Sequence, residues 1–142
     1  LIAVAGSPYP MHDQWGIPSQ IFVGTLEGLT DENRQRFNRR MCGGKRYKQL
    51  YDILSERPTT ELRDELQAVY DSLATSEESE TTPHTRLAWD LAIIGERDQI
   101  FPAKNLSTLW EAVNVPTLLL PDGYHYLFDL WHSWRELWAD IK

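Results

Sequence analysis

The chain has 142 residues, 42% of them hydrophobic, and a formal net charge of −7. This length and apolar content suit a single packed domain and exclude a wholly disordered chain. The acidic balance argues against general nucleic-acid binding, and no apolar run approaches the roughly eighteen residues that a membrane span needs.

The first predicted element is a buried strand at residues 1–5, an apolar run that Gly6 closes. The chain opens on Leu1, inside this run, so we expect it to be the C-terminal part of a longer protein. His12 and Asp13 lie in the turn that follows. They could line a crevice at the strand end, but a surface turn is the simpler interpretation.

Residues 17–84 are predicted to be mainly helical. The first helix begins near residue 18, Thr30 caps the second helix, and Gly43-Gly44 ends it. A third helix is expected around residues 47–54 and a fourth from Thr59. Apolar positions in the first and fourth helices repeat at helical spacing and are expected to be buried: Ile21, Phe22, Leu26, Leu29, Leu62, Leu66, Val69, Tyr70 and Leu73.

Half of the basic residues fall in one short block within this helical segment. Residues 34–48 contain no acidic residue and seven basic ones: Arg34, Arg36, Arg39, Arg40, Lys45, Arg46 and Lys48. Like charges this close repel one another, so the block favours an acidic partner, although a solvated helix face would also account for it. Cys42, the one cysteine, is expected to pack at a helix end. A single thiol and the lack of a basic leader agree with a cytoplasmic location.

The sheet is predicted to resume after a hydrophilic loop at residues 75–83. The runs at residues 91–94 and 117–120 are short and apolar on both faces, which is typical of buried parallel strands. A helix from about Asn105 to Val113 connects them. Beyond the last strand, apolar residues at helical spacing predict a C-terminal helix whose aromatic stripe belongs to the core: Leu127, Leu130, Trp131, Trp134, Leu137, Trp138 and Ile141.

Asp98 and His125 follow the second and third predicted strands directly. The carboxyl ends of parallel strands meet at one edge of a sheet, where ligands bind, so we expect the two side chains to converge. A carboxylate and an imidazole in this order form two thirds of a hydrolase triad. No serine in the chain has the Gly-x-Ser-x-Gly surroundings of the nucleophile, which we therefore expect to lie outside it. Taken singly, each residue could equally be a turn residue.

These elements predict an α/β fold. They look like the last three parallel strands of an α/β-hydrolase with flanking helices and an inserted helical cap. Residues 1–16 and 85–142 would form the C-terminal part of the hydrolase core, and residues 17–84 the cap.

Specific strings give this layout a family resemblance over nearly the whole chain. Gly6-Ser7-Pro8 with Gly16-Ile17-Pro18, the distinctive Asn38-Arg39-Arg40-Met41-Cys42, and the Asp98 and His125 motifs resemble the BioG type of pimeloyl-carrier-protein methyl ester esterase.

The resemblance implies a serine esterase that removes the methyl ester of a pimeloyl chain on acyl carrier protein, a step in biotin synthesis. Asp98 and His125 would be the acid and histidine of its triad, and the basic block would dock the acidic carrier protein. The chain alone should be inactive, and we expect it to associate with the missing N-terminal part of its own fold. We expect no cofactor and no metal, because no cluster has ligand spacing, and no chemical role for His84 or His132.

Two alternatives remain open. The chain could be a non-catalytic module whose basic helices dock an acidic protein or nucleic acid, which would leave Asp98 and His125 without a role. It could also belong to an acyl hydrolase with another ester or thioester substrate.

Overall fold

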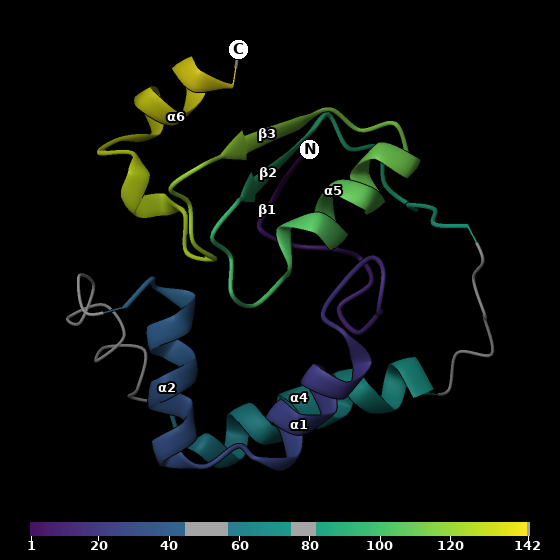
Figure 1. Cartoon of the computed structure of the whole chain (residues 1–142), viewed down its shortest axis with the longest axis vertical. Coiled ribbons are helices and arrows are strands. Elements are labelled where there is room, and N and C mark those ends of the chain that lie inside the picture. The colour runs from purple at the N-terminus through teal and green to yellow at the C-terminus, as the bar shows by residue number, and fades with distance from the viewer. Residues whose placement is uncertain (45–56, 75–81, 142) are drawn as a thin grey trace.

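The computed structural model describes residues 1–44, 57–74 and 82–141. Its centre is a three-stranded parallel sheet in the order β1 (Ile2–Val4), β2 (Leu91–Gly95) and β3 (Thr117–Leu120) (Figure 1). The register aligns Ala3 with Ala92 and Ile93 with Leu118. The three predicted strands and their parallel pairing are confirmed, and the architecture is α/β with helices flanking the sheet.

The strands are not buried to the same degree, contrary to the prediction. In the central strand, residues 92–94 are at most 1% exposed, whereas Leu119 in β3 is 44% exposed. The reason is position in the sheet, because β3 has only β2 beside it among the described residues.

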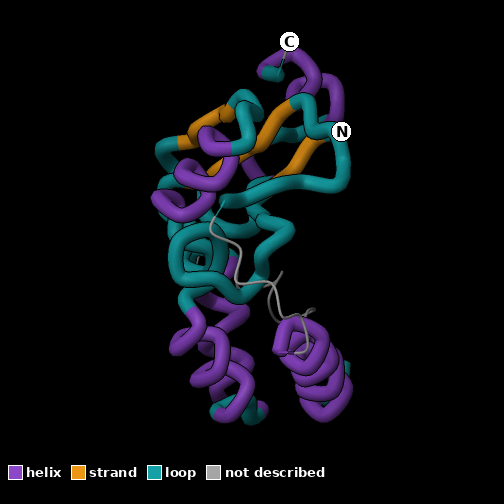
Figure 2. Tube along the Cα trace, turned by 90° about the vertical axis from the view of Figure 1, so that its right-hand side faces the viewer, coloured by secondary structure: helices purple, strands orange, loops and turns teal. Residues whose placement is uncertain are grey.

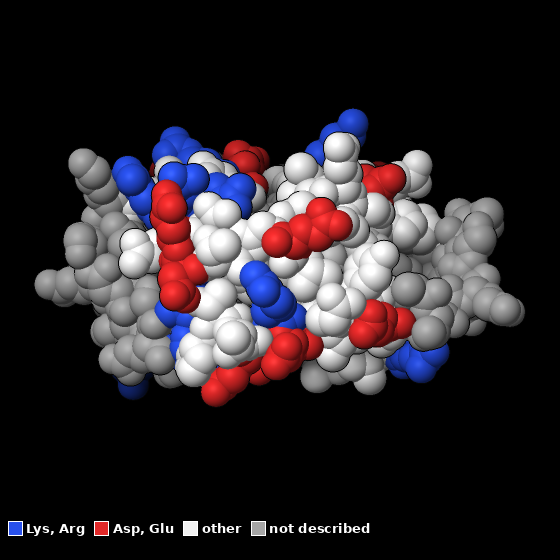
Figure 3. All heavy atoms as spheres, turned by 90° about the horizontal axis from the view of Figure 1, so that it is seen from below, with Lys and Arg blue, Asp and Glu red and all other residues white. Residues whose placement is uncertain are grey.

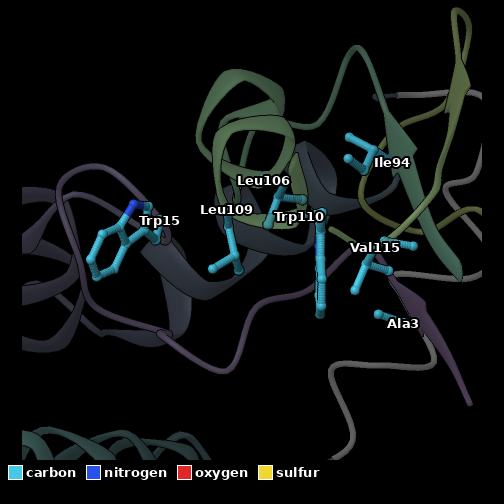
Figure 4. Close-up of a cluster of buried hydrophobic side chains, with 8 residues drawn as sticks. Ala3, Trp15, Ile94, Leu106, Leu109, Trp110 and Val115 are labelled. Atoms are coloured by element: carbon cyan, nitrogen blue, oxygen red, sulfur yellow. The ribbon is translucent and has the colours of Figure 1, made fainter. Parts of the chain in front are cut away.

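Helix α5 (Ala103–Ala112) covers one face of the sheet and supplies most of the core there. Leu106 and Leu109 are fully buried, and Trp110 is 1% exposed in the same core cluster as Ile94 (Figure 4). The predicted connection between the second and third strands is therefore confirmed, two residues earlier than expected at its start.

The opposite face is covered by the C-terminal segment, which differs from the prediction. A short 3-10 helix, η2 (Phe128–Leu130), ends where Trp131 adopts an extended backbone, and helix α6 (Trp134–Asp140) follows. Ser133 caps α6 by accepting a hydrogen bond from the backbone N–H of Glu136 at 3.3 Å.

Because the helix is interrupted, the predicted apolar stripe is not continuous. Leu127 and Leu137 are buried beside Ile93, but Trp134 and Trp138 are 67% and 51% exposed. The expectation that the stripe belongs to the core is wrong for these two tryptophans and for Leu130, which is 39% exposed.

A second group of helices stands away from the sheet: α1 (Ser19–Glu27), α2 (Asp31–Met41) and α4 (Thr59–Ala74) (Figures 1 and 2). The side chain of Thr30 accepts a hydrogen bond from the N–H of Asn33 at 3.2 Å, which confirms the predicted cap of α2. The Asp13 carboxylate accepts one from the N–H of Ser19 at 2.7 Å and so begins α1. None of the described helices is long and apolar enough to cross a membrane.

The buried faces of α1 and α4 agree only in part with the predicted spacing. Phe22 and Leu26 are buried, but Ile21 is 56% exposed and Val69 36% exposed. The predicted third helix lies outside the described residues, as do most of the return loop and the side chains of Lys45, Arg46 and Lys48.

Candidate active site

Asp98 lies in the turn that follows β2, and its side chain is fully buried. A hydrogen bond from its own N–H to the carbonyl of Gly95, 3.1 Å long, closes the turn. Oδ1 accepts hydrogen bonds from the N–H groups of Ile100 at 2.7 Å and Phe101 at 3.0 Å. The carboxylate therefore has a fixed orientation, with Oδ2 left for another partner.

His125 supplies that partner from the loop after β3. Its Nδ1 lies 2.9 Å from Oδ2 of Asp98, and its side chain is 23% exposed. The N–H of Arg97 donates to the carbonyl of Gly123 at 2.9 Å, which joins the two loops. The predicted convergence of Asp98 and His125 at one edge of the sheet is confirmed.

The pair has the geometry in which an imidazole acts as a base through its other nitrogen. A carboxylate accepts the proton of Nδ1 and so leaves Nε2 unprotonated in the neutral ring. Within residues 1–44, 57–74 and 82–141, no group forms a hydrogen bond with Nε2. The sequence did not single out Phe101, which stacks on the imidazole with ring centroids 5.8 Å apart, although an aromatic three residues after Asp98 was a visible signal.

A largely apolar cavity of about 320 Å³ lies between helices α1, α2 and α4 and the turn that carries Asp98. Gln99 and Ile100, which follow Asp98 directly, form one wall. The other walls come from α1, α2 and α4, through side chains such as Phe22, Met41 and Leu66. An aliphatic chain suits such a lining, because apolar surface gains free energy when it leaves water.

The described part of the basic block divides into an exposed face and a buried residue. Arg36, Arg39 and Arg40 are exposed and line an open groove of about 820 Å³ between α1 and α2. The guanidinium of Arg40 lies 5.9 Å from the centre of the Phe37 ring, and Arg36 pairs with Glu32 at 2.6 Å. Figure 3 shows the underside of these helices, where basic side chains gather most densely at the upper left and acidic ones lie among them.

Arg34 does not belong to this exposed face, so its predicted docking role is wrong. It is 7% exposed, and its guanidinium donates to the carbonyl of Arg57 and, at 3.1 Å, to the hydroxyl of Thr59. It is four residues before the buried Asn38 on α2, so it lies on the inward side of the helix and joins α2 to the start of α4.

The remaining residues that the sequence singled out lie in a turn, at a helix end or at the surface. Nδ1 of His12 accepts hydrogen bonds from the N–H groups of Gln14 and Trp15, and its ring stacks on Trp15 at 4.1 Å, which confirms the turn interpretation. Cys42 is 1% exposed at the end of α2, as predicted, and burial raises the pKa of its thiol. His84 and His132 are exposed. Within the described part of the chain, no cluster of His, Cys, Asp and Glu side chains could hold a metal ion.

Comparison with known proteins identifies the family of the chain. Residues 1–137 match the family described as Pimeloyl-ACP methyl esterase BioG. The chain is 41% identical over 126 residues to a malonyl-[acyl-carrier protein] O-methyltransferase of Bacteroides fragilis (strain 638R), a match that covers 88% of this chain and 24% of that protein. It is 34% identical over 136 residues to an uncharacterised protein of Haemophilus influenzae, covering 96% of this chain and 60% of that one.

A solved structure agrees with these matches. The crystal structure of BioG from Haemophilus influenzae superposes with a TM-score of 0.83 at 33% identity, over 96% of this chain and 61% of that chain. The chain thus spans less than two thirds of the length of these relatives. The match over residues 1–137 and the shared structure show that the chain belongs to the BioG family of pimeloyl-ACP methyl esterases.

Proposed function

We propose that the protein to which this chain belongs hydrolyses the methyl ester of a pimeloyl chain carried by acyl carrier protein, in biotin synthesis. His125 takes the proton of a serine that the rest of the protein supplies, and later gives it to the departing methanol. Asp98 holds the imidazole in the required tautomer and stabilises its charged form. Residues 1–16 and 85–142 belong to an α/β-hydrolase core in this proposal, and residues 17–84 to its cap.

The observation that carries the proposal is the 2.9 Å contact between His125 Nδ1 and Asp98 Oδ2. The carboxylate is buried and held by two backbone N–H groups, so little reorganisation is needed when the imidazole becomes charged. This arrangement argues against the non-catalytic module, which gives the pair no role.

Two further observations support the substrate. The apolar cavity beside the Asp98 turn suits an acyl chain. The exposed groove with Arg36, Arg39 and Arg40 suits an acidic carrier, because opposite potentials steer encounter. The methyltransferase name belongs to a protein of which this chain matches only 24%. A paired imidazole and carboxylate is typical of enzymes that catalyse acyl transfer rather than methyl transfer.

The decisive test is Asp98→Asn in the full-length protein, assayed by methanol release from carrier-linked methyl pimelate. We expect kcat to fall on the order of 10⁴-fold, because the amide favours the wrong tautomer. Asp122→Asn is the matched control, since Asp122 is exposed and pairs with Arg97 rather than with the imidazole. A fall of less than tenfold for Asp98→Asn would remove the pair from the mechanism.

A second measurement tests the carrier. Changing Arg39 and Arg40 together to Glu should raise KM for the carrier-linked ester several-fold and leave a small untethered methyl ester almost unaffected. Changing Arg86 and Arg135 to Glu alters the net charge equally at exposed sites outside the α1–α2 groove, and serves as the control. Equal losses in the two double variants would contradict a specific docking face.

A further inference from the structure

The end of α2 contacts the loop that carries His125. Figure 1 shows this helix end pointing toward the loop after β3. The N–H of Tyr126 donates a hydrogen bond to the carbonyl of Met41 at 3.0 Å. On the other side of His125, the ring of Tyr124 lies against Gly43. The two residues that flank the histidine are thus both in contact with α2 or the residues that end it.

Gly43 fits this contact for a steric reason. Its φ is +79°, and a Cβ atom added there would lie 2.5 to 2.7 Å from three atoms of the Tyr124 ring. Gly44 also has a positive φ, +101°, but an added Cβ would meet nothing within 4 Å. Backbone conformation alone therefore accounts for Gly44, whereas Gly43 is also required by the close approach of an aromatic ring.

The imidazole ring itself contacts residues of the segment that follows β2. Asp98 binds Nδ1, and Phe101 stacks on the ring. The 2.9 Å bond to Asp98 therefore depends on where the loop backbone lies, and part of that backbone is attached to the end of α2 rather than to the sheet.

We propose that the Met41–Gly43 end of α2 positions His125: the Met41 carbonyl holds the backbone after the histidine, and Gly43 leaves room for the Tyr124 ring before it, so that Nδ1 reaches Asp98. Gly43 is a positioning residue in this view, and it does not touch substrate. The inference rests on the proposed function for its effect on turnover, but its structural content concerns the His125–Asp98 bond alone. Arg36, Arg39 and Arg40 lie on the same helix as Met41. The position of the His125 side chain therefore depends on how the helix that carries these arginines packs against the sheet domain.

The test compares Gly43→Ala with Gly44→Ala. Both changes place a side chain at a positive φ and should lower the melting temperature for that reason, but only Gly43→Ala also drives a methyl group into Tyr124. The first readout is the downfield proton NMR signal of His125 Nδ1–H in the full-length protein, assigned by its loss in His125→Ala. We expect Gly43→Ala to abolish the signal and Gly44→Ala to keep it.

The second readout is turnover of a small untethered ester by the full-length protein. Gly43→Ala should lower kcat about 10²-fold with KM little changed, since a displacement near 1 Å is enough for such a loss. Adding Tyr124→Ala to Gly43→Ala removes the clash while the Tyr126–Met41 bond remains, and should restore the NMR signal and at least tenfold of the activity.

Three results would overturn the inference: a retained signal in Gly43→Ala, equal loss of the signal in both glycine variants, or no recovery in the double variant. If Gly43→Ala does not fold, the double variant still decides: a double variant that folds and keeps the NMR signal shows that the clash with Tyr124 was the cause, and one that folds without the signal overturns the inference. If the NMR results agree with the inference but Asp98→Asn keeps full activity, the positioning of His125 by α2 stands and only the proposed function is refuted.

Discussion

Replacing Gly95 with alanine should separate the two loops that carry Asp98 and His125. Gly95 is the last residue of β2, and a Cβ atom there would lie 2.5 Å from the carbonyl oxygen of Gly123 and 2.7 Å from that of Tyr124. Both neighbours are backbone atoms, which cannot rotate away as a flexible side chain can. Reaching the 3.4 Å of ordinary contact requires a shift of about 0.9 Å (3.4 − 2.5) between the strand end and the histidine loop.

Overpacking of this kind costs about 2 kcal/mol of folding stability. For a chain of this length, the melting temperature should fall by about 6–8 °C. The same shift displaces His125 relative to Asp98 by close to 1 Å, enough to lower turnover of the full-length protein about 10²-fold.

Thermal unfolding followed by circular dichroism measures the first effect, and the distance between Nδ1 and Oδ2 in a crystal structure of the variant measures the second. Gly6→Ala is the control, because Gly6 lies just beyond the end of β1 and an added Cβ would lie at an ordinary 3.6 Å from the carbonyl oxygen of Val4. The reasoning is refuted if the two variants melt together, or if Gly95→Ala keeps the 2.9 Å contact.

Two other predictions concern the core and the start of α1. Trp110→Ala should destabilise the fold by about 4 kcal/mol in chemical denaturation, because the side chain is 1% exposed, whereas the 67% exposed Trp134 should cost less than about 0.5 kcal/mol. A comparable cost at both tryptophans would contradict the assigned core. The hydrogen bond from the N–H of Ser19 lowers the pKa of Asp13, so its contribution to stability is present above the ordinary carboxyl pKa and is lost as pH falls through the lowered one. Asp13→Asn should therefore reduce the acid-dependent change in stability below about pH 4, and an unchanged pH profile would show that this cap does not matter.

The parts of the fold that the sequence predicted well depend on short-range patterns. The three strands are brief apolar runs bounded by turn residues, and their parallel pairing requires the carboxyl ends to share one edge. That geometry brings Asp98 and His125 together even though they are distant in the chain. The outer strand was judged too buried because an apolar run does not reveal how many neighbours the strand has.

The errors arose where residues were grouped by their distance along the sequence, without regard to which side of a helix they face or where the helix begins. Arg34 was grouped with the exposed arginines by sequence distance, although its spacing of i, i+3, i+4, i+7 with Phe37, Asn38 and Met41 places it on the inward side of α2. At the C-terminus, Ser133 and Glu136 form the Ser-x-x-Glu pattern of a helix start, which marks the beginning of α6 inside what was taken as one helix. The contact between Gly43 and Tyr124 joins separate segments and leaves no local signal beyond the glycine itself.

The register of the sheet also has consequences for the order of folding. Ala92 of β2 pairs with Thr117 after a short crossover through α5, whereas Ile2 of β1 pairs with Leu91 only after the chain has passed through α1, α2 and α4. Closing the longer loop costs about 1 kcal/mol more in chain entropy, and contacts between such distant residues slow folding. We therefore expect β2, α5 and β3 to assemble early as a nucleus, with β1 added last. Because β1 precedes α1 and β2 follows α4 in the chain, the slow step that docks the first strand is also the step that brings α1 and α4 into place.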